Sequence, residues 1–274
     1  MSSKTFNQIL KGVSKKEEHY EAQIPTSWMQ GRASFGGLLA ALAVEAMQQA
    51  LYQGEGQEVE KKLPLRALQV LFVGPVGDQP IRIETTKLRQ GKNVTSMRAD
   101  LIQGGNVGCS VMACFGASRT SELSLDAKLM PIVADPESLK PFHYEEGKTP
   151  SFTQHFDMRW AEGDSPLTGC KERTHGIWTR FHEKGPASIA HLIAIADIPP
   201  PIGLSMLTTP TAGSSLTWSL EFLGDEWQAN TDGWWYVRTE LAQSSQGYGQ
   251  QSYSIWTPDG QPVALGRQVM TVFG

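Results

Sequence analysis

Two parts of the chain, about 150 residues apart, carry the same succession of hydrophobic and polar patterns. In the first part, an almost wholly apolar segment at residues 36–51 precedes alternating, strand-like runs that begin at residues 68–73. In the second part, an apolar segment at residues 186–197 precedes strand-like runs that begin at residues 216–223. Because alternation indicates strands and a longer apolar segment indicates a helix, the order of elements repeats. The pattern predicts a chain that contains one kind of domain twice.

Each copy is predicted to combine a buried helix with antiparallel strands. Residues 36–51 have Ala, Leu, Val or Met on nearly every side of a helical wheel, and such a helix must be wrapped by other structure. Pro186 suits the first turn of the second helix, and the prolines at 199–201 prevent its continuation. The expected strands lie near residues 64–74, 80–89, 93–103 and 107–117, and then near 152–160, 174–182, 214–223, 234–242, 250–256 and 263–273. This predicts an α+β fold in which two copies of a curled antiparallel sheet are each wrapped around one apolar helix.

The segment between the two copies has a different character. Residues 118–150 contain scattered proline, serine and charged residues without periodicity, which is typical of an interdomain connection. We therefore expect an N-terminal domain at residues 1–120, a linker at 121–150 and a C-terminal domain at 151–274.

Composition narrows the classes of partner. The 274 residues are 40% hydrophobic and 19% charged, which is typical of globular domains. A net charge of −4 argues against a nucleic-acid or anionic-lipid partner, and no run of 18 apolar residues predicts a membrane span. The three cysteines are odd in number and lack CxxC spacing, so we expect reduced thiols and a cytoplasmic protein.

Several familiar catalytic signatures are missing from the sequence. There is no GxSxG elbow, no phosphate-binding or dinucleotide-binding glycine motif and no HExxH motif. The six histidines are spread without metal-ligand spacing. We therefore expect neither a metal nor an organic cofactor.

Three residues of the second copy are candidate site residues, although each has an ordinary structural explanation. Asp197 ends the apolar helix, where the helix dipole disfavours a negative charge, but an aspartate also forms turns ahead of Pro199. Ser215 begins a strand in which alternation is expected to place it on one face with Thr217 and Ser219. Gln268 lies within an otherwise apolar strand face, where it needs partners if buried, or else marks a sheet edge.

Taken together, the three residues resemble a known pattern. The acyl-CoA thioesterase II family has an Asp at the end of the second helix, a Thr or Ser at the start of the next strand and a Gln in the last strand. The matching stretches here are Ala196-Asp197, Ser214-Ser215-Leu216 and Val263–Gln268, with further similarity at Ser34–Gly37, Gln154–Asp157 and Trp178–Arg180. The stretches Ile198–Pro201 and Leu223–Asp225 depart from the family pattern.

The resemblance implies a double-hotdog enzyme of fatty acid metabolism, a homo-oligomer, that hydrolyses acyl-CoA to free acid and CoA. It implies that Asp197 activates or orients a water molecule and that Ser215 and Gln268 position it. A thiolate leaves readily because the pKa of its thiol is roughly 8.5, so no dedicated acid is required. By analogy, backbone N–H groups at Gly36 and Gly37, at the start of the first helix, are candidate oxyanion donors.

Two alternative functions remain open at this stage. A hotdog hydratase or dehydratase usually needs a histidine beside the carboxylate, but His191 lies six residues before Asp197 and is expected on another side of the helix. A non-catalytic acyl-thioester-binding double hotdog would keep the same residues without turnover. The acyl group and the residues that bind the CoA phosphates stay undefined; the available cationic residues are Arg32, Lys87, Arg89, Lys92 and Arg267.

The repeat also predicts how many sites one chain carries. With Phe72 aligned to Phe222, Asp197 corresponds to Met47 and Ser215 to Leu65. With Phe115 aligned to Phe273, Gln268 corresponds to Ser110. Since methionine and leucine side chains neither accept a proton nor hold a water molecule, we expect one site per chain.

Overall fold

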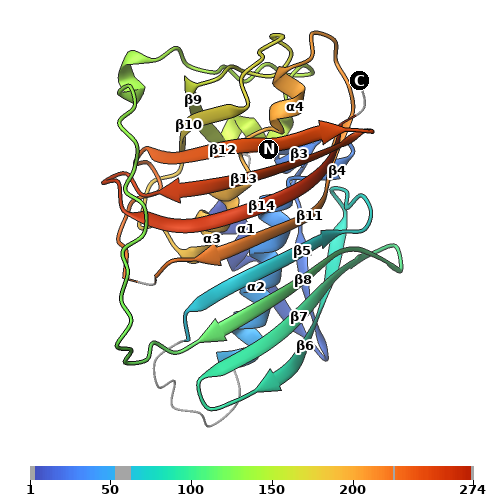
Figure 1. The fold of residues 1–274 in the computed structure, drawn as a ribbon. Coiled ribbons are helices and arrows are strands. Elements are labelled where there is room, and N and C mark those ends of the chain that lie inside the picture. Colours follow the sequence, from blue (N-terminus) through green and yellow to red (C-terminus); the bar gives the residue numbers. More distant parts are fainter. Residues whose placement is uncertain (1–3, 53–62, 225, 273–274) are drawn as a thin grey trace.

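The computed structural model describes residues 4–52, 63–224 and 226–272, and its main feature is one antiparallel sheet of twelve strands in the order β1-β2-β6-β7-β8-β5-β11-β14-β13-β12-β10-β9 (Figure 1). In chain order, the first six strands of this sheet are β1 (Ser14–Lys16), β2 (His19–Gln23), β5 (Leu65–Phe72), β6 (Pro80–Gln90), β7 (Val94–Gln103) and β8 (Asn106–Gly116). The other six are β9 (Phe156–Glu162), β10 (Thr174–Phe181), β11 (Gly213–Phe222), β12 (Trp235–Ser245), β13 (Tyr248–Trp256) and β14 (Pro262–Val272). A separate two-stranded ribbon pairs β3 (Met29–Gln30) with β4 (Ala33–Ser34).

The helices are few. They are α1 (Phe6–Lys11), α2 (Gly36–Tyr52), α3 (Ile189–Ala196) and α4 (Ile202–Ser205), with 3₁₀ turns η1 (Thr26–Trp28), η2 (Pro136–Ser138) and η3 (Ser151–His155). The mostly-sheet class and both predicted apolar helices are therefore confirmed. The second helix begins at Ile189, three residues after the predicted start at Pro186, and its first turn has a capping box formed by Ser188 and His191. Within the described residues, no helix is long and apolar enough to span a bilayer.

The two halves share their sheet. Strand β5 of the first half pairs antiparallel with β11 of the second, from Leu71 opposite Thr217 to Ala67 opposite Glu221. The prediction of two curled sheets, each wrapped around its own helix, was therefore wrong: one sheet runs through both halves and is not curled. Because an unpaired strand edge exposes a row of backbone N–H and C=O groups, each half satisfies the inner edge of the other.

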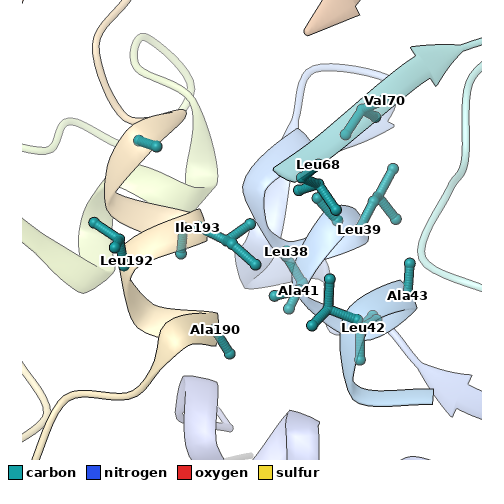
Figure 2. Packing of buried hydrophobic residues seen from close by; sticks show 14 of the residues in the cluster. Leu38, Leu39, Ala41, Leu42, Ala43, Leu68, Val70, Ala190, Leu192 and Ile193 are labelled. Carbon is teal, nitrogen blue, oxygen red and sulfur yellow. The ribbon is translucent and has the colours of Figure 1, made fainter. Parts of the chain in front are cut away.

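The buried helices α2 and α3 pack against each other on one side of this sheet. Residues 36–44 of α2 are all buried, and so are residues 190–196 of α3. Figure 2 shows Ile193 of α3 pointing toward Leu38 of α2. Burying a side chain of this size is worth roughly 1.5–3 kcal/mol, so the contact between α2 and α3 stabilises the packing of the two halves.

Candidate functional site

The structure brings the three predicted residues of the second copy together. The side-chain amide of Gln268 donates from Nε2 to the Ser215 hydroxyl oxygen at 2.6 Å and, in a longer contact, to Asp197 Oδ1 at 3.4 Å. The residues lie on α3, β11 and β14, so their contact is a product of the tertiary fold.

Asp197 forms the C-cap of α3, and its backbone N–H donates to the carbonyl oxygen of Ala194. The residue keeps partial solvent accessibility, but its carboxyl group is surrounded by protein. This burial raises the pKa of Asp197 to about 7, against the opposing effect of hydrogen bonds from the Gly37 backbone N–H and the Gln268 amide. A carboxyl group with such a pKa exchanges a proton readily near neutral pH.

Ser215 reaches the site because β11 has a β-bulge. Ser215 lies opposite Met270 of β14, whereas Thr217 lies opposite Val269, so the register shifts between the two residues. Facing residues in antiparallel strands share a face, so Ser215 shares the inner face with buried Met270. The prediction that simple alternation keeps Ser215, Thr217 and Ser219 on one face was wrong, since a bulge interrupts the alternation of side chains.

Gln268 lies in the interior of the sheet. Its strand β14 runs between β11 and β13, and its side chain is 7% exposed on the inner face, opposite Trp218. The alternative explanation of Gln268 as a sheet-edge residue is therefore wrong. Its amide makes the hydrogen bonds that a buried polar group requires.

The first half of the chain completes the site. The backbone N–H of Gly37 donates to the Asp197 carboxyl group, so the start of α2 faces this carboxylate. A Cβ atom placed on Gly36 would lie 2.6 Å from Asp197 Oδ2 and 2.8 Å from the ring of Phe72. Only a glycine leaves room for both groups. The two predicted helix-start residues therefore lie at the site, and the site combines both halves.

Gln251 is a neighbour of the site that the sequence reasoning missed. It is buried, and its Nε2 donates to Oε1 of Gln268 at 3.2 Å. A signal for it exists in the sequence: the other alternate positions of this strand, Gly249, Tyr253 and Ile255, are small or apolar. A glutamine in such a series needs a hydrogen-bonding partner inside the protein.

His191 lies away from the Asp197 carboxylate. Its ring is buried at the start of α3, with Nε2 3.2 Å from Glu183 Oε1 and Nδ1 within hydrogen-bond distance of Ser188. Asp197 ends the same helix, about 9 Å further along the axis at 1.5 Å per residue. The expectation that His191 lies elsewhere on the helix is confirmed, so His191 is not placed as a partner for Asp197.

Two of the further stretches that matched the family pattern, Gln154–Asp157 and Trp178–Arg180, belong to a second polar cluster, at η3, β9 and β10. Asp157 accepts a hydrogen bond from Arg180 at 2.7 Å and lies 3.1 Å from His182 Nε2. His155 stacks on Trp28 with ring centroids 4.1 Å apart, and burial lowers the pKa of its imidazole to about 4. These contacts tie η1 to the second half of the chain, a structural role.

All five candidate cationic residues are exposed, whereas the Asp197 carboxyl group is buried. Arg267 is exposed on the opposite face of β14 from Gln268, because neighbouring strand residues alternate. Arg32 is exposed in the turn between β3 and β4, just before α2. Of these two, Arg32 lies nearer in sequence to the α2 end of the site.

Two family profiles match this chain, one in each half. The family profile for the acyl-CoA thioesterase N-terminal domain matches residues 24–116, and the profile for the acyl-CoA thioesterase C-terminal domain matches residues 136–272. No curated protein matches the chain.

Solved structures extend the similarity to the whole chain. A protein of unknown function with a hot dog fold, from Alicyclobacillus acidocaldarius, is 22% identical with a TM-score of 0.85, covering 100% of this chain and 99% of that one. The acyl-CoA thioesterase II TesB2 from Mycobacterium marinum is 19% identical with a TM-score of 0.74, covering 98% of each chain. A tesB protein from Mycobacterium avium subsp. paratuberculosis is 15% identical with a TM-score of 0.76, covering 99% of this chain and 100% of that one. At these identities the likeness shows the hotdog fold.

Proposed function

This chain belongs to the acyl-CoA thioesterase family, and from that premise we propose that it hydrolyses an acyl-CoA thioester to the free acid and CoA. The observation that carries the proposal is the hydrogen-bonded group of Asp197, Ser215 and Gln268, which lies against the start of α2. The group supplies a proton acceptor, a hydroxyl and an amide in one place, which is what the activation of a water molecule requires.

In the proposed mechanism, Asp197 takes a proton from a water molecule while Ser215 and Gln268 hold that water in line with the thioester carbonyl carbon. The water oxygen forms the new C–O bond, and the carbonyl oxygen becomes an oxyanion. Collapse of this intermediate breaks the C–S bond and releases CoA as a thiolate, which leaves without a dedicated acid because its thiol has a pKa near that of cysteine, roughly 8.5. The proton held by Asp197 then passes to bulk solvent or to the thiolate.

Gly36 and Gly37 are proposed to stabilise the oxyanion with backbone N–H groups at the positive end of α2. In the structure, the Gly37 N–H donates to Asp197. Because a backbone N–H is a single donor, we propose that Gly37 holds the carboxylate in place and that the oxyanion role falls mainly to the Gly36 N–H. The opposing effect of the Gly37 N–H on the pKa of Asp197 helps to keep a proton acceptor available near neutral pH.

The proposal includes the organisation of the chain. We propose a double hotdog with an N-terminal domain at residues 1–120, a linker at 121–150 and a catalytic C-terminal domain at 151–274. Its cellular setting would be fatty acid metabolism in the cytoplasm, as a homo-oligomer. The proposed division into two domains is supported by the repeated element order and by the strand pairing between β5 and β11.

A panel of short, long, branched and aromatic acyl-CoA thioesters tests the activity, with a thiol-reactive dye to detect released CoA. We expect CoA release together with the free acid in the mass spectrum. A mass gain or loss of one water with the thioester intact would indicate a hydratase or dehydratase instead. Tight binding of every thioester without turnover would indicate an acyl-binding protein and overturn the proposal.

A further inference from the structure

Gln251 of β13 faces Gln268 of β14 across the sheet, and their side chains are 3% and 7% exposed. Gln251 Nε2 donates to Gln268 Oε1 at 3.2 Å, and the backbone N–H of Ile202 donates to Gln251 Oε1 at 3.2 Å. A continuous series of hydrogen bonds therefore runs from the first residue of α4 to the candidate catalytic group.

The Ile202 N–H, at the start of this series, determines how the side-chain amides of Gln251 and Gln268 are oriented. A backbone N–H only donates, so the oxygen of Gln251 must face Ile202 and its NH₂ group must face Gln268. The oxygen of Gln268 must then face Gln251, which leaves its NH₂ group for Ser215 and Asp197. An amide that turned over by 180° would present its oxygen to the Asp197 carboxylate and repel it.

We propose that Gln251 is a positioning residue for hydrolysis, which holds the Gln268 amide in the one orientation that donates to both Asp197 and Ser215. The inference rests on the proposed thioesterase function for its effect on turnover. Its structural content, the orientation of the Gln268 amide, is independent of that function.

The chain segment after Asp197 strengthens this arrangement. Ile202 follows Asp197 by five residues, and three of the four residues between them are prolines with a fixed φ angle. The carboxylate, the Pro199–Pro201 segment, Gln251 and Gln268 thus form a closed ring of covalent and hydrogen bonds. The proline segment, which departs from the family pattern, has a physical use here: its fixed φ angles restrict where the Ile202 N–H can lie relative to Asp197.

The titration of Asp197 can be used to follow its hydrogen bond from Gln268, because the other groups that face Asp197 keep the same charge. Gln268, Ser215 and the Gly37 N–H do not titrate near neutral pH. The titratable neighbours of Asp197 are Tyr253 of β13 and Cys109 of β8. Burial raises the pKa of Tyr253 well above its ordinary value and that of Cys109 to about 12, so both side chains stay neutral between pH 5 and 9. A change in the pKa of Asp197 therefore reports the hydrogen bond from Gln268.

Two substitutions separate orientation from simple packing. Gln251→Leu removes both hydrogen bonds at nearly constant volume. Gln251→Glu, when ionised, accepts from Ile202 and also from Gln268, and so turns the Gln268 amide away from Asp197. Once protonated, the carboxyl group that this second substitution introduces again has one acceptor and one donor, as the native amide has. The matched control is Gln250→Glu, because Gln250 pairs with Val269 and points to the other face of β13.

We expect Gln251→Leu to lower kcat roughly 10-fold with little change in KM, as loss of a positioning group does. The pKa of the acidic limb of its pH profile should rise, because the hydrogen bond from Gln268 lowers the pKa of Asp197. For Gln251→Glu, the ratio of its kcat to the wild-type kcat should increase as the pH falls and the new carboxyl group is protonated. Gln250→Glu should match the wild type at every pH.

The titration of Asp197 should also be followed without substrate, by the ¹³C shift of its carboxyl carbon, assigned through its loss in Asp197→Asn. Folded Gln251 variants with unchanged Asp197 titration would overturn the proposal, as would a constant kcat ratio for Gln251→Glu. If Gln251→Leu fails to fold, the near-isosteric Gln251→Glu decides alone. Wild-type turnover in Asp197→Asn would instead remove the proposed function. A higher Asp197 pKa in the uncharged Gln251→Leu variant, followed by ¹³C, would still support the orienting role.

Discussion

The same irregularity occurs in both halves of the sheet, but only one half uses it to place a polar group. Strand β5 shifts register against β8 between Leu65 and Ala67, and β11 shifts against β14 between Ser215 and Thr217. The two bulges are 150 positions apart, as are Phe72 and Phe222. In the first half the bulge turns a buried leucine inward, and in the second it turns a serine toward Gln268. The backbone irregularity is common to both halves, whereas the side chains at the bulge differ.

The strand register also identifies which residue of the first half corresponds to Gln268. Leu68 lies opposite Ala113, and its counterpart Trp218 lies opposite Gln268. The structural counterpart of Gln268 is therefore Ala113, and the prediction of Ser110 was wrong. That alignment relied on Phe273, which lies outside the described residues. Ser110 instead donates to Asp100 on the neighbouring strand.

The largest effect is expected at Asp197. Asp197→Asn should lower kcat by about 10²-fold or more, because it removes the proton acceptor of the proposed mechanism. Wild-type kcat should rise with pH through about 7, since the carboxylate is the active form. Stopped or continuous CoA-release assays across the pH range measure both. Near wild-type turnover in the variant would show that the second half holds no special site.

Loss of the positioning groups should follow. Ser215→Ala and Gln268→Ala should each lower kcat roughly 10- to 10³-fold while the protein stays folded, because they leave the water poorly oriented. Thr217→Ala is the matched control, since Thr217 lies on the other side of the bulge and is exposed. Equal losses in Thr217→Ala and Ser215→Ala would contradict the role assigned to the bulge. Circular dichroism checks the fold.

The contribution of the first half is tested at Gly36. In Gly36→Ala, the new Cβ atom would be 2.6 Å from Asp197 Oδ2, so the carboxylate must move. A displacement of this kind should lower kcat about 10- to 100-fold. Gly74→Ala is the control, because a Cβ atom there has no neighbour within 4 Å. Unchanged kcat in Gly36→Ala would mean that the second half works without the first.

The last prediction concerns the number of ligand molecules that one chain binds. Isothermal titration with a non-hydrolysable thioether analogue of an acyl-CoA should give about one bound molecule per chain, because Met47, Leu65 and Ala113 offer no acceptor or donor side chain. Two equivalent sites would break the comparison between the halves. So would catalysis that survives simultaneous replacement of Asp197, Ser215 and Gln268.

Local patterns were sufficient for some of this structure. The apolar segment 36–51 is wrapped by protein, as its composition predicts, and α2 ends one residue later, at Tyr52. The resemblance to a known family pointed to Asp197, Ser215 and Gln268, and their side chains lie within hydrogen-bond distance of one another through Gln268. The predictions that failed depend on strand register and on pairing across the sheet: the two separate curled sheets, the side-chain alternation at Ser215 and the counterpart of Gln268. Alternation along one strand carries no information about its partner's register.

The pairing of β5 with β11 has a consequence for whether either half could do without the other. A carboxylate from the second half is held by a backbone N–H from the first, so neither copy owns the site. A chain that lacked either half would have an incomplete candidate site and an unpaired strand edge at β5 or β11. The first half has no polar counterparts of Asp197 and Gln268, yet its Gly37 N–H holds the carboxylate of the second half.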